Sequence, residues 1–360
     1  MTRPGGAGMS ARTVSSLAAI DRGTRVRIGV VAALLAAVIF LLPPLLSLYW
    51  IDVLTATAIY SVVALGLGLL MGRVGLVSLG QIAILALGAW VAARIDFGTA
   101  LPFPIVVLLA GLVTMVLGTL VGLPALRLSG LYLALITLML AGAITVVMTA
   151  TNFPNGGHGF LGHTESATGS TAIRRPAIAE SDPGYFRYTV VVAALMFLLA
   201  LWHIRAKPGR AWAAIRQSEP AALAAGVNIT FYKLWAFALA SFMTGVAGGL
   251  LGPSVGKLYT FQFPTRDSII LLAVVLMGGI YSLWGAVVAG MFMKFLPAVL
   301  DSLSLPADLL TILFGVGVLQ VLLTAPAGLA AQMPKDLARL WGAISGAARR
   351  RGRPAEERAH

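Results

Sequence analysis

The sequence contains no cysteine, and only 11% of its 360 residues are charged. Without cysteine the chain can form no disulfide or thiolate site, so a metal site would need histidine or carboxylate ligands. A soluble domain carries about 25% charged residues, roughly twice as many. Hydrophobic residues make up 59% of the chain, and the mean hydropathy is +0.91. These values predict an all-α integral membrane protein.

Two features that would supply energy for transport are also missing. The nearest approach to a nucleotide-binding P-loop, Gly252–Leu258, lacks the first glycine at the required spacing and has Leu258 where serine or threonine must bind magnesium. Carriers driven by protons or sodium usually place acids or histidines within their spans, and every acid here falls in a loop, a tail or at a membrane edge. Lys294 is the one charge away from the ends of the predicted spans and is expected to snorkel or to pair with a loop. Energy must therefore come from outside this chain.

Hydrophobic runs predict a polytopic helical bundle of about ten transmembrane helices, because each crossing needs roughly 20 apolar residues. The runs cover about residues 28–50, 53–71, 75–93, 102–123, 131–151, 188–204, 233–252, 267–280, 284–300 and 307–325. Around Tyr281–Trp284 a second interpretation stays open, in which one long helix and a re-entrant piece replace two short spans. That interpretation would move the C-terminal tail to the other side of the membrane.

The distribution of basic residues predicts the orientation, because lysine and arginine gather in cytoplasmic loops. With the N-terminus inside, most of the 26 lysines and arginines lie on the cytoplasmic side. The predicted regions are a cytoplasmic basic tail (1–27), a transmembrane domain (28–330) and a second cytoplasmic basic tail (331–360). Within the domain, 152–186 is the outer loop and 205–232 a polar cytoplasmic loop. This asymmetry accounts for the formal net charge of +13, so no nucleic-acid partner is expected.

The polar stretch Lys207–Lys233 is too charged to cross a bilayer and is predicted to form two short helical pieces. Ser218 is a favourable N-cap, Glu219 and Pro220 suit the first turn that follows, and Gly226 suits the end of the helix. A capped, alanine-rich helix in the polar loop of a membrane protein suggests a docking element.

Small and polar residues open the third predicted span: Gly72, Gly75, Ser78, Gly80 and Gln81. Glycines at such a place permit a broken helix whose freed backbone groups line a polar cavity. A G-x-x-S-L pattern recurs in 279–290, which indicates an internal repeat. Close helix packing through small residues is the alternative explanation.

The outer loop carries His158, His163 and Glu165, the one group of side chains that resembles a metal or catalytic cluster. Their spacing fits no established metal motif, so no metal site is expected. No nucleophile-and-base arrangement is present either, and no catalytic residue is assigned. A membrane-embedded enzyme remains an alternative that would have to use these three residues.

Five segments resemble the permeases of branched-chain amino acid ABC importers, specifically the permease subunit with the longer outer loop. They are Gly75–Ala83, Leu126–Leu138, Asn155–Phe160, Gly209–Ser241 and Val275–Gly290. The fourth is the most specific, because its order, spacing and residue types match the loop through which such permeases contact their ATPase. The sequence departs from the family at Ile84 and Leu85, where aromatics are frequent, and at His158 and Phe160 within a glycine-rich motif. These departures bear on the solute rather than on the fold.

The resemblance implies a transmembrane subunit of an ATP-driven importer for branched-chain or related amino acids, in a bacterial inner membrane with both termini cytoplasmic. The implied partners are a second similar permease, two ATP-binding subunits, an external solute-binding protein (periplasmic or lipid-anchored) and membrane lipid. ATP and magnesium would be held by the ATPase, and no cofactor by this chain. Alternative solutes are urea, amides and aromatic acids. An ion-coupled secondary carrier is an alternative of another class.

The same resemblance assigns residues. Those implied to couple the chain to the ATPase are Arg210, Arg216, Glu219, Ala221, Ala222 and Gly226. The alanines, with Ala224, would form a smooth contact face, Glu219 would be a polar anchor, and the arginines would flank it. Ser78, Gln81 and Asn155 are candidates for lining or gating the path of the solute.

Overall fold

The computed structural model describes residues 22–99, 101–128, 130–151, 175–256 and 258–303, with single positions between 309 and 332. Two compact units are distinguished, residues up to Ile51 and residues from Asp52 onward, and each is described by itself. The first unit contains α1 (Arg22–Leu45) and the start of α2. The predicted first span, 28–50, is wrong at its end, because α1 stops at Leu45 and α2 begins at Leu48. Pro43 and Pro44 explain the early end, since proline donates no backbone hydrogen bond.

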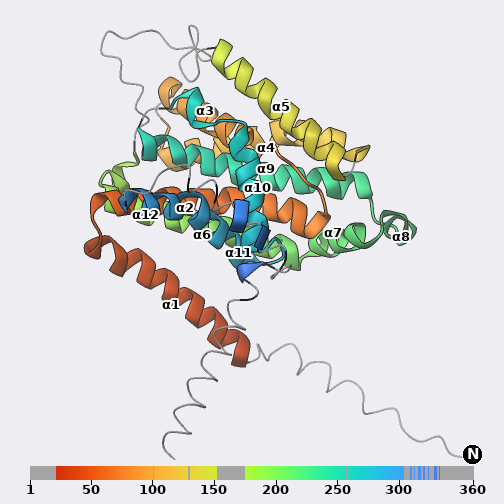
Figure 1. The fold of residues 1–360 in the computed structure, drawn as a ribbon, viewed down its shortest axis with the longest axis horizontal. Coiled ribbons are helices and arrows are strands. Elements are labelled where there is room, and N and C mark those ends of the chain that lie inside the picture. The colour runs from red at the N-terminus through yellow and green to blue at the C-terminus, as the bar shows by residue number, and fades with distance from the viewer. Residues whose placement is uncertain are drawn as a thin grey trace, which may run out of the picture. The chain divides into compact units, whose positions relative to one another are not determined.

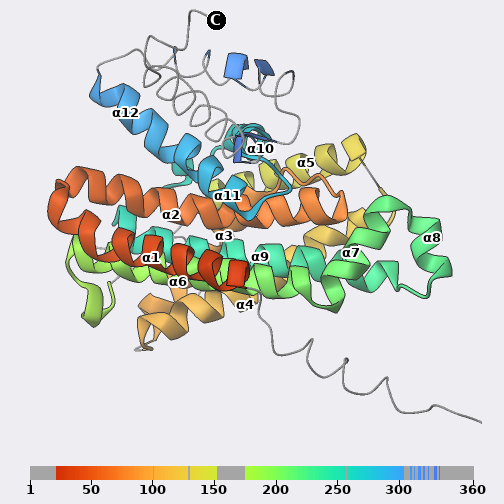
Figure 2. The ribbon, with the colours of Figure 1, turned by 90° about the horizontal axis from the view of Figure 1, so that it is seen from below.

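The second unit is helical throughout its described residues, apart from turns and short connections (Figures 1 and 2). Its long helices are α2 (Leu48–Leu69), α3 (Gln81–Gly98), α4 (Phe103–Gly122), α5 (Gly130–Ala150), α6 (Asp182–Arg205), α9 (Ile229–Val255) and α10 (Arg266–Gly278). Its shorter helices are α7 (Lys207–Gln217), α8 (Glu219–Ala224), α11 (Leu283–Gly290) and α12 (Leu296–Ser302). Two π-helical turns, η2 (Leu70–Val74) and η6 (Met291–Phe295), and the 3-10 turns η3 (Leu123–Leu126), η4 (Ala177–Ala179) and η5 (Thr260–Gln262) complete it.

Within the described residues, seven helical segments are long and apolar enough to cross a membrane. They are Leu48–Val74, Phe103–Gly122, Gly130–Ala150, Asp182–Arg205, Ile229–Val255, Thr260–Gly278 and Leu283–Ser302. Each overlaps one of the ten predicted spans, with ends that differ by up to seven residues. The first prediction corresponds to a shorter apolar helix, Gly29–Leu45, and the third to α3 (Gln81–Gly98), which is not one of these seven segments. Most of the tenth, 307–325, lies outside the described residues. The protein is thus a polytopic helical membrane protein.

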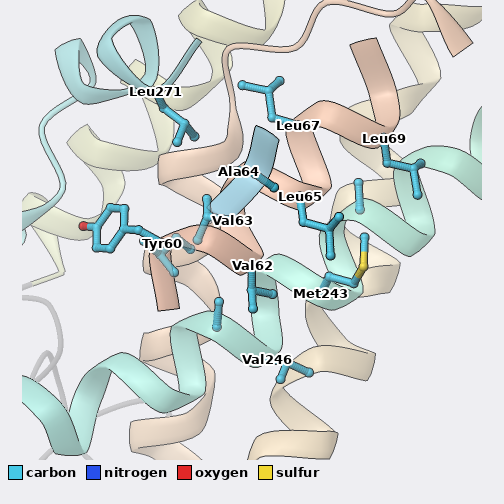
Figure 3. Packing of buried hydrophobic residues seen from close by; sticks show 14 of the residues in the cluster. Tyr60, Val62, Val63, Ala64, Leu65, Leu67, Leu69, Met243, Val246 and Leu271 are labelled. Carbon is cyan, nitrogen blue, oxygen red and sulfur yellow. The ribbon is translucent and has the colours of Figure 1, made fainter. Parts of the chain in front are cut away.

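The core of the second unit is the packing of α9 against α3 and α4. Glycines bring these helices together: a Cβ atom added at Gly88 would lie 2.7 Å from the Cα atom of Gly245, and one at Gly118 would lie 1.8 Å from Ser241 Oγ. Such contacts matter in a membrane, where tight packing replaces the hydrophobic effect as the force between helices. Figure 3 shows the adjoining layer, in which Val62 and Leu65 of α2 lie near Met243 of α9.

The first break in the helices separates η2 from α3. The predicted third span, 75–93, is wrong at its start, since residues 75–80 are not helical and α3 begins at Gln81. Gly75 has a φ of 86°, a left-handed conformation that glycine adopts without strain. The backbone N–H of Leu79, buried in this segment, donates to Thr137 Oγ1 of α5 at 2.9 Å. The broken helix predicted from the glycines is present.

The second break lies between α10 and α11. Gly279 has a φ of 107°, and α11 begins four residues later, so this region forms two helices rather than one long helix. A Cβ atom added at Gly72 would lie 1.9 Å from the carbonyl oxygen of Ile280. The end of η2, just before the first copy of the G-x-x-S-L pattern, therefore meets the second copy backbone against backbone, which sequence periodicity did not predict.

Loops predicted to lie on the same side of the membrane are neighbours in the structure. On the predicted outer side, Arg175 forms an ion pair with Asp182 and donates to the carbonyl oxygen of Pro253 at 3.3 Å. Nearby, the Tyr185 hydroxyl donates to the carbonyl oxygen of Leu250 at 2.6 Å. The predicted cytoplasmic segments meet through a different set of contacts, which form the candidate site.

Candidate functional site

The polar segment between α6 and α9 consists of α7 and α8, the two short helices expected over Lys207–Lys233. Ser218 is the N-cap of α8, and its Oγ accepts from the backbone N–H of Ala221 at 3.4 Å. Gly226 ends the segment with a φ of 79°. In both views α8 lies at one end of the bundle, beyond α7 (Figures 1 and 2).

The buried face of α7 fixes this segment to the start of α9. Trp212 is fully buried, and its indole Nε1 donates to the carbonyl oxygen of Tyr232 at 2.8 Å. Ala211 and Ile215 are buried on the same face, one position before and three after Trp212, as helical periodicity requires. Movement of α7 must therefore be passed to α9.

Arg216, on the last turn of α7, joins this segment to both helix breaks. Its Nη1 donates to the carbonyl oxygen of Gly72 at 2.6 Å, and its Nη2 donates to the Tyr281 hydroxyl at 2.6 Å. The guanidinium also lies over the Tyr281 ring, 4.5 Å from its centroid. The planar fork of arginine allows one side chain to make all three contacts. We call Arg216, Gly72 and Tyr281 the Arg216 clamp.

The exposed surface of α8 differs from the alanine face expected from the sequence. Ala221 and Ala224 are exposed, but Ala222 is 2% exposed and packs into the chain's own core, because a helix must turn one face toward its support. Leu223, which was not singled out from the sequence, is 64% exposed. Leu223 is thus the one large apolar side chain that α8 leaves uncovered.

Glu219 of α8 forms an ion pair with Lys233 of α9, with Oε1 and Nζ 2.8 Å apart. The Lys233 side chain is only 5% exposed, whereas that of Glu219 is 46% exposed. The predicted polar anchor thus binds this chain itself and connects α8 to a position near the start of a membrane helix. Lys233 was not assigned from the sequence, where it reads only as the polar edge of a span.

The two described path candidates lie at the start of α3. Ser78 is fully buried, and its Oγ accepts from the backbone N–H of Gly80 at 3.4 Å. Gln81 is 1% exposed, and its Oε1 accepts from Thr244 Oγ1 of α9 at 2.8 Å. Its Nε2 has no hydrogen-bond partner in the described part of the chain. Asn155 lies outside the described residues.

A family model and two individual relatives place the chain in the same family. The family model described as branched-chain amino acid transport system, permease component, matches residues 49–322. The high-affinity branched-chain amino acid transport system permease protein LivM of Salmonella typhimurium strain LT2 is 31% identical over 296 residues, covering 77% of this chain and 69% of LivM. LivM of Escherichia coli strain K12 is 30% identical over 298 residues, with the same coverage. No solved structure matches significantly.

The chain belongs to the branched-chain amino acid transport permease family. The matched region of the permease contains both helix breaks, α7, α8 and every member of the Arg216 clamp. Of the other residues implied to contact an ATPase, Arg210 and Gly226 are exposed. Both lie in the same α7–α8 segment as Arg216.

Two further sequence expectations meet different outcomes in the permease. The Lys294 ammonium lies 4.3 Å from the centroid of the Tyr60 ring on α2, so one of its neighbours is an aromatic ring inside the bundle. His158, His163 and Glu165 lie outside the described residues. Within the residues that were described, no group of three histidines or acids could hold a metal ion.

The contribution of the Glu219–Lys233 ion pair can be measured by a double-mutant cycle on the purified permease. We expect Glu219→Ala and Lys233→Met to lower the thermal unfolding midpoint singly, and the double variant to lose less than the sum. The expected coupling energy is about 1 kcal/mol, because the half-exposed carboxylate is partly screened by water. Strictly additive losses would show that the two side chains do not interact.

Proposed function

We propose that this permease is the transmembrane subunit of an ATP-driven ABC importer that moves branched-chain or related amino acids. The observation that carries the proposal is the Arg216 clamp. It connects both helix breaks to a segment that presents Leu223 to a partner. A chain without a nucleotide site of its own needs such a connection to an energy source.

In this proposal α8 docks on an ATP-binding subunit, and a second, similar permease completes the membrane path. Closure of the two ATP-binding subunits around ATP and magnesium moves α8, and α7 follows. Because Arg216 holds the carbonyl oxygen of Gly72 and the hydroxyl of Tyr281, the movement reaches both breaks together. The helices then change between outward-open and inward-open arrangements, as expected of a bistable packed element.

The proposed setting is a bacterial inner membrane, with α7, α8 and both termini on the cytoplasmic side. An external binding protein, periplasmic or lipid-anchored, would deliver the solute and set most of the specificity. The buried start of α3, with Ser78 and Gln81, is the proposed part of the path in this chain. The unpartnered Gln81 Nε2 supports this assignment, since a buried amide without a hydrogen bond is costly.

Reconstitution in proteoliposomes tests the function. The permease, its cognate second permease, ATP-binding subunits and binding protein are expected to take up radiolabelled leucine only when ATP and the binding protein are both supplied. The permease alone under a proton or sodium gradient is expected to take up none. Gradient-driven uptake by the single chain would instead identify a secondary carrier. A ligand screen on the binding protein separates branched-chain amino acids from urea, amides and aromatic acids.

A further inference from the structure

The segment 75–80, between η2 and α3, is not helical although most of it is buried. Its backbone N–H groups need partners, because an unpaired N–H group inside a membrane is costly. The N–H of Leu76 donates to the carbonyl oxygen of Leu70 in the preceding turn, whereas that of Leu79 donates to Thr137 Oγ1 of α5. Of the N–H hydrogen bonds that this segment makes with described residues, the bond from Leu79 is the one that reaches a distant part of the chain.

Thr137 is built to hold this N–H group in one position. Its side chain is fully buried, and its Oγ1 lies 2.9 Å from the Leu79 nitrogen. The hydroxyl donates its own proton to the carbonyl oxygen of Ala134, one turn earlier on α5, at 3.0 Å. A hydroxyl has one donor and two acceptor lone pairs, so this bond leaves Oγ1 free to accept from Leu79. Both partners of the hydroxyl are therefore backbone groups.

The same junction is a close backbone contact. A Cβ atom added at Gly80 would lie 3.5 Å from the carbonyl oxygen of Thr137 and 3.9 Å from its Cβ atom. In Figure 1, α5 lies along one edge of the bundle. Its buried residues form a single narrow stripe: Leu133, Ala134, Thr137, Ala141 and Met148. Thr137 thus lies within the strip of α5 that holds this helix to the rest of the permease.

Gly75 lies between two points at which other helices hold the chain. On one side Arg216 of α7 donates to the carbonyl oxygen of Gly72, and on the other side Thr137 accepts from the N–H of Leu79. Gly75 has a φ of 86° and, having no Cβ atom, can change its backbone angles at little cost. A pull on Gly72 will bend the chain at Gly75 only if the far side of the break stays in place.

We propose that Thr137 is a positioning residue for transport, which holds Ser78 and Gln81 in place while the first break bends at Gly75. Because the proposed function supplies the movement of α7, this role of Thr137 rests on that function. Without the hydroxyl, a pull on Gly72 displaces the path residues together with the break, and ATP is hydrolysed without transport. Residues 76–81 and α5 accordingly keep their contact throughout the transport cycle.

Thr137→Val tests this role, because it replaces the hydroxyl with a methyl group of similar shape and leaves the buried N–H of Leu79 unpaired. We expect the amount of solute transported per ATP hydrolysed to fall about tenfold while the ATP-binding subunits remain attached. Thr137→Ser keeps the hydroxyl and should stay within about twofold of the wild type. In the purified permease, hydrogen exchange at Leu79 should be about tenfold faster in Thr137→Val and unchanged in Thr137→Ser.

Thr114→Val is the matched control. Thr114 is also fully buried, and its Oγ1 donates to the carbonyl oxygen of Ala110 within its own helix, α4. The substitution removes a hydroxyl of the same kind without releasing segment 75–80. The ratio of transport to hydrolysis and the hydrogen exchange at Leu79 should both remain at the wild-type values.

The absence of cysteine from the chain allows a second test, which also serves if Thr137→Val fails to fold. Gly80→Cys combined with Thr137→Cys places two Cβ atoms 3.9 Å apart, within the range of about 3.5–4.5 Å that a disulfide requires. Because the segment and α5 keep their contact, the oxidised double variant should transport within about twofold of the wild type per ATP. Its reduction should lower this ratio about tenfold, as in Thr137→Val. Each single cysteine variant should give the same ratio before and after oxidation.

Two results would overturn the role of Thr137. A wild-type ratio in Thr137→Val, with a lower unfolding midpoint, would show that the hydroxyl serves stability alone. Loss of transport when the double cysteine variant is oxidised would show that the segment and α5 must separate. Neither result affects the proposed function, which fails instead if the wild-type permease takes up no solute with ATP and the binding protein supplied. That outcome would remove both.

Discussion

Leu223→Asp is expected to lower ATP-driven uptake about thirtyfold. Leu223 is 64% exposed on α8, between Ala221 and Ala224, whose small side chains allow a partner surface to approach closely. An apolar anchor at the centre of a protein interface contributes 2 kcal/mol or more, which is about thirtyfold in affinity. A buried carboxylate adds a desolvation penalty. Uptake in proteoliposomes and co-purification of the ATP-binding subunit should fall together.

Ile178→Asp is the matched control for this substitution. Ile178 is 84% exposed on η4, a short turn before α6 on the predicted outer side. This substitution places the same negative charge at an apolar position that is at least as exposed as Leu223. The ATP-binding subunit should still co-purify. If Leu223→Asp retains both the ATP-binding subunit and uptake, then α8 is not the docking helix.

Arg216→Gln is expected to lower the amount of solute transported per ATP hydrolysed more than tenfold while the ATP-binding subunits remain attached. The substitution removes two charge-assisted hydrogen bonds, to Gly72 and to Tyr281, each contributing about 1.5–3 kcal/mol. It leaves Leu223 and the cap of α8 in place. Docking and hydrolysis should therefore continue without moving the helix breaks, which parallel assays of ATPase activity and uptake will detect.

Three companion variants separate the contributions within the clamp. Arg216→Lys keeps the charge but loses the planar fork, so it should resemble Arg216→Gln. Tyr281→Phe removes one acceptor and keeps the ring, so a smaller loss of about fivefold is expected, near 1 kcal/mol. Lys207→Gln, at the exposed start of α7, should leave the ratio unchanged. A wild-type ratio of transport to hydrolysis in Arg216→Gln would rule out the clamp as the route of coupling.

The parts of the site that depend on local chemistry could be predicted from the sequence. Ser218 caps α8 through an N–H three residues away, and Gly226 ends the segment through its own backbone angle. Hydrophobic run length likewise located most spans to within a few residues. The end of α1 was misplaced because run length counts Pro43 and Pro44 as apolar and ignores their missing donors.

The parts that depend on long-range contacts could not be predicted. Arg216 meets Gly72 across 144 positions of sequence, and the guanidinium could equally have pointed toward a partner. Lys233 pairs with Glu219, and Lys294 lies over the ring of Tyr60. Both contacts depend on how the helices pack, which residue spacing in the sequence does not determine. A helix of six residues is also too short for periodicity to show that Ala222 turns inward while Ala221 and Leu223 turn outward.

The glycine contacts that join α3, α4 and α9 have a mechanical consequence. At Gly88 and Gly245 backbone meets backbone, and at Gly118 the backbone meets the side chain of Ser241, so hardly any deformable side-chain layer separates the three helices. Close-packed protein interiors have low compressibility, and this block will therefore move as a rigid body. Any bending that a transport cycle requires must then occur outside this block. The helix breaks at Gly75 and Gly279 are the positions where we expect the backbone to change its angles.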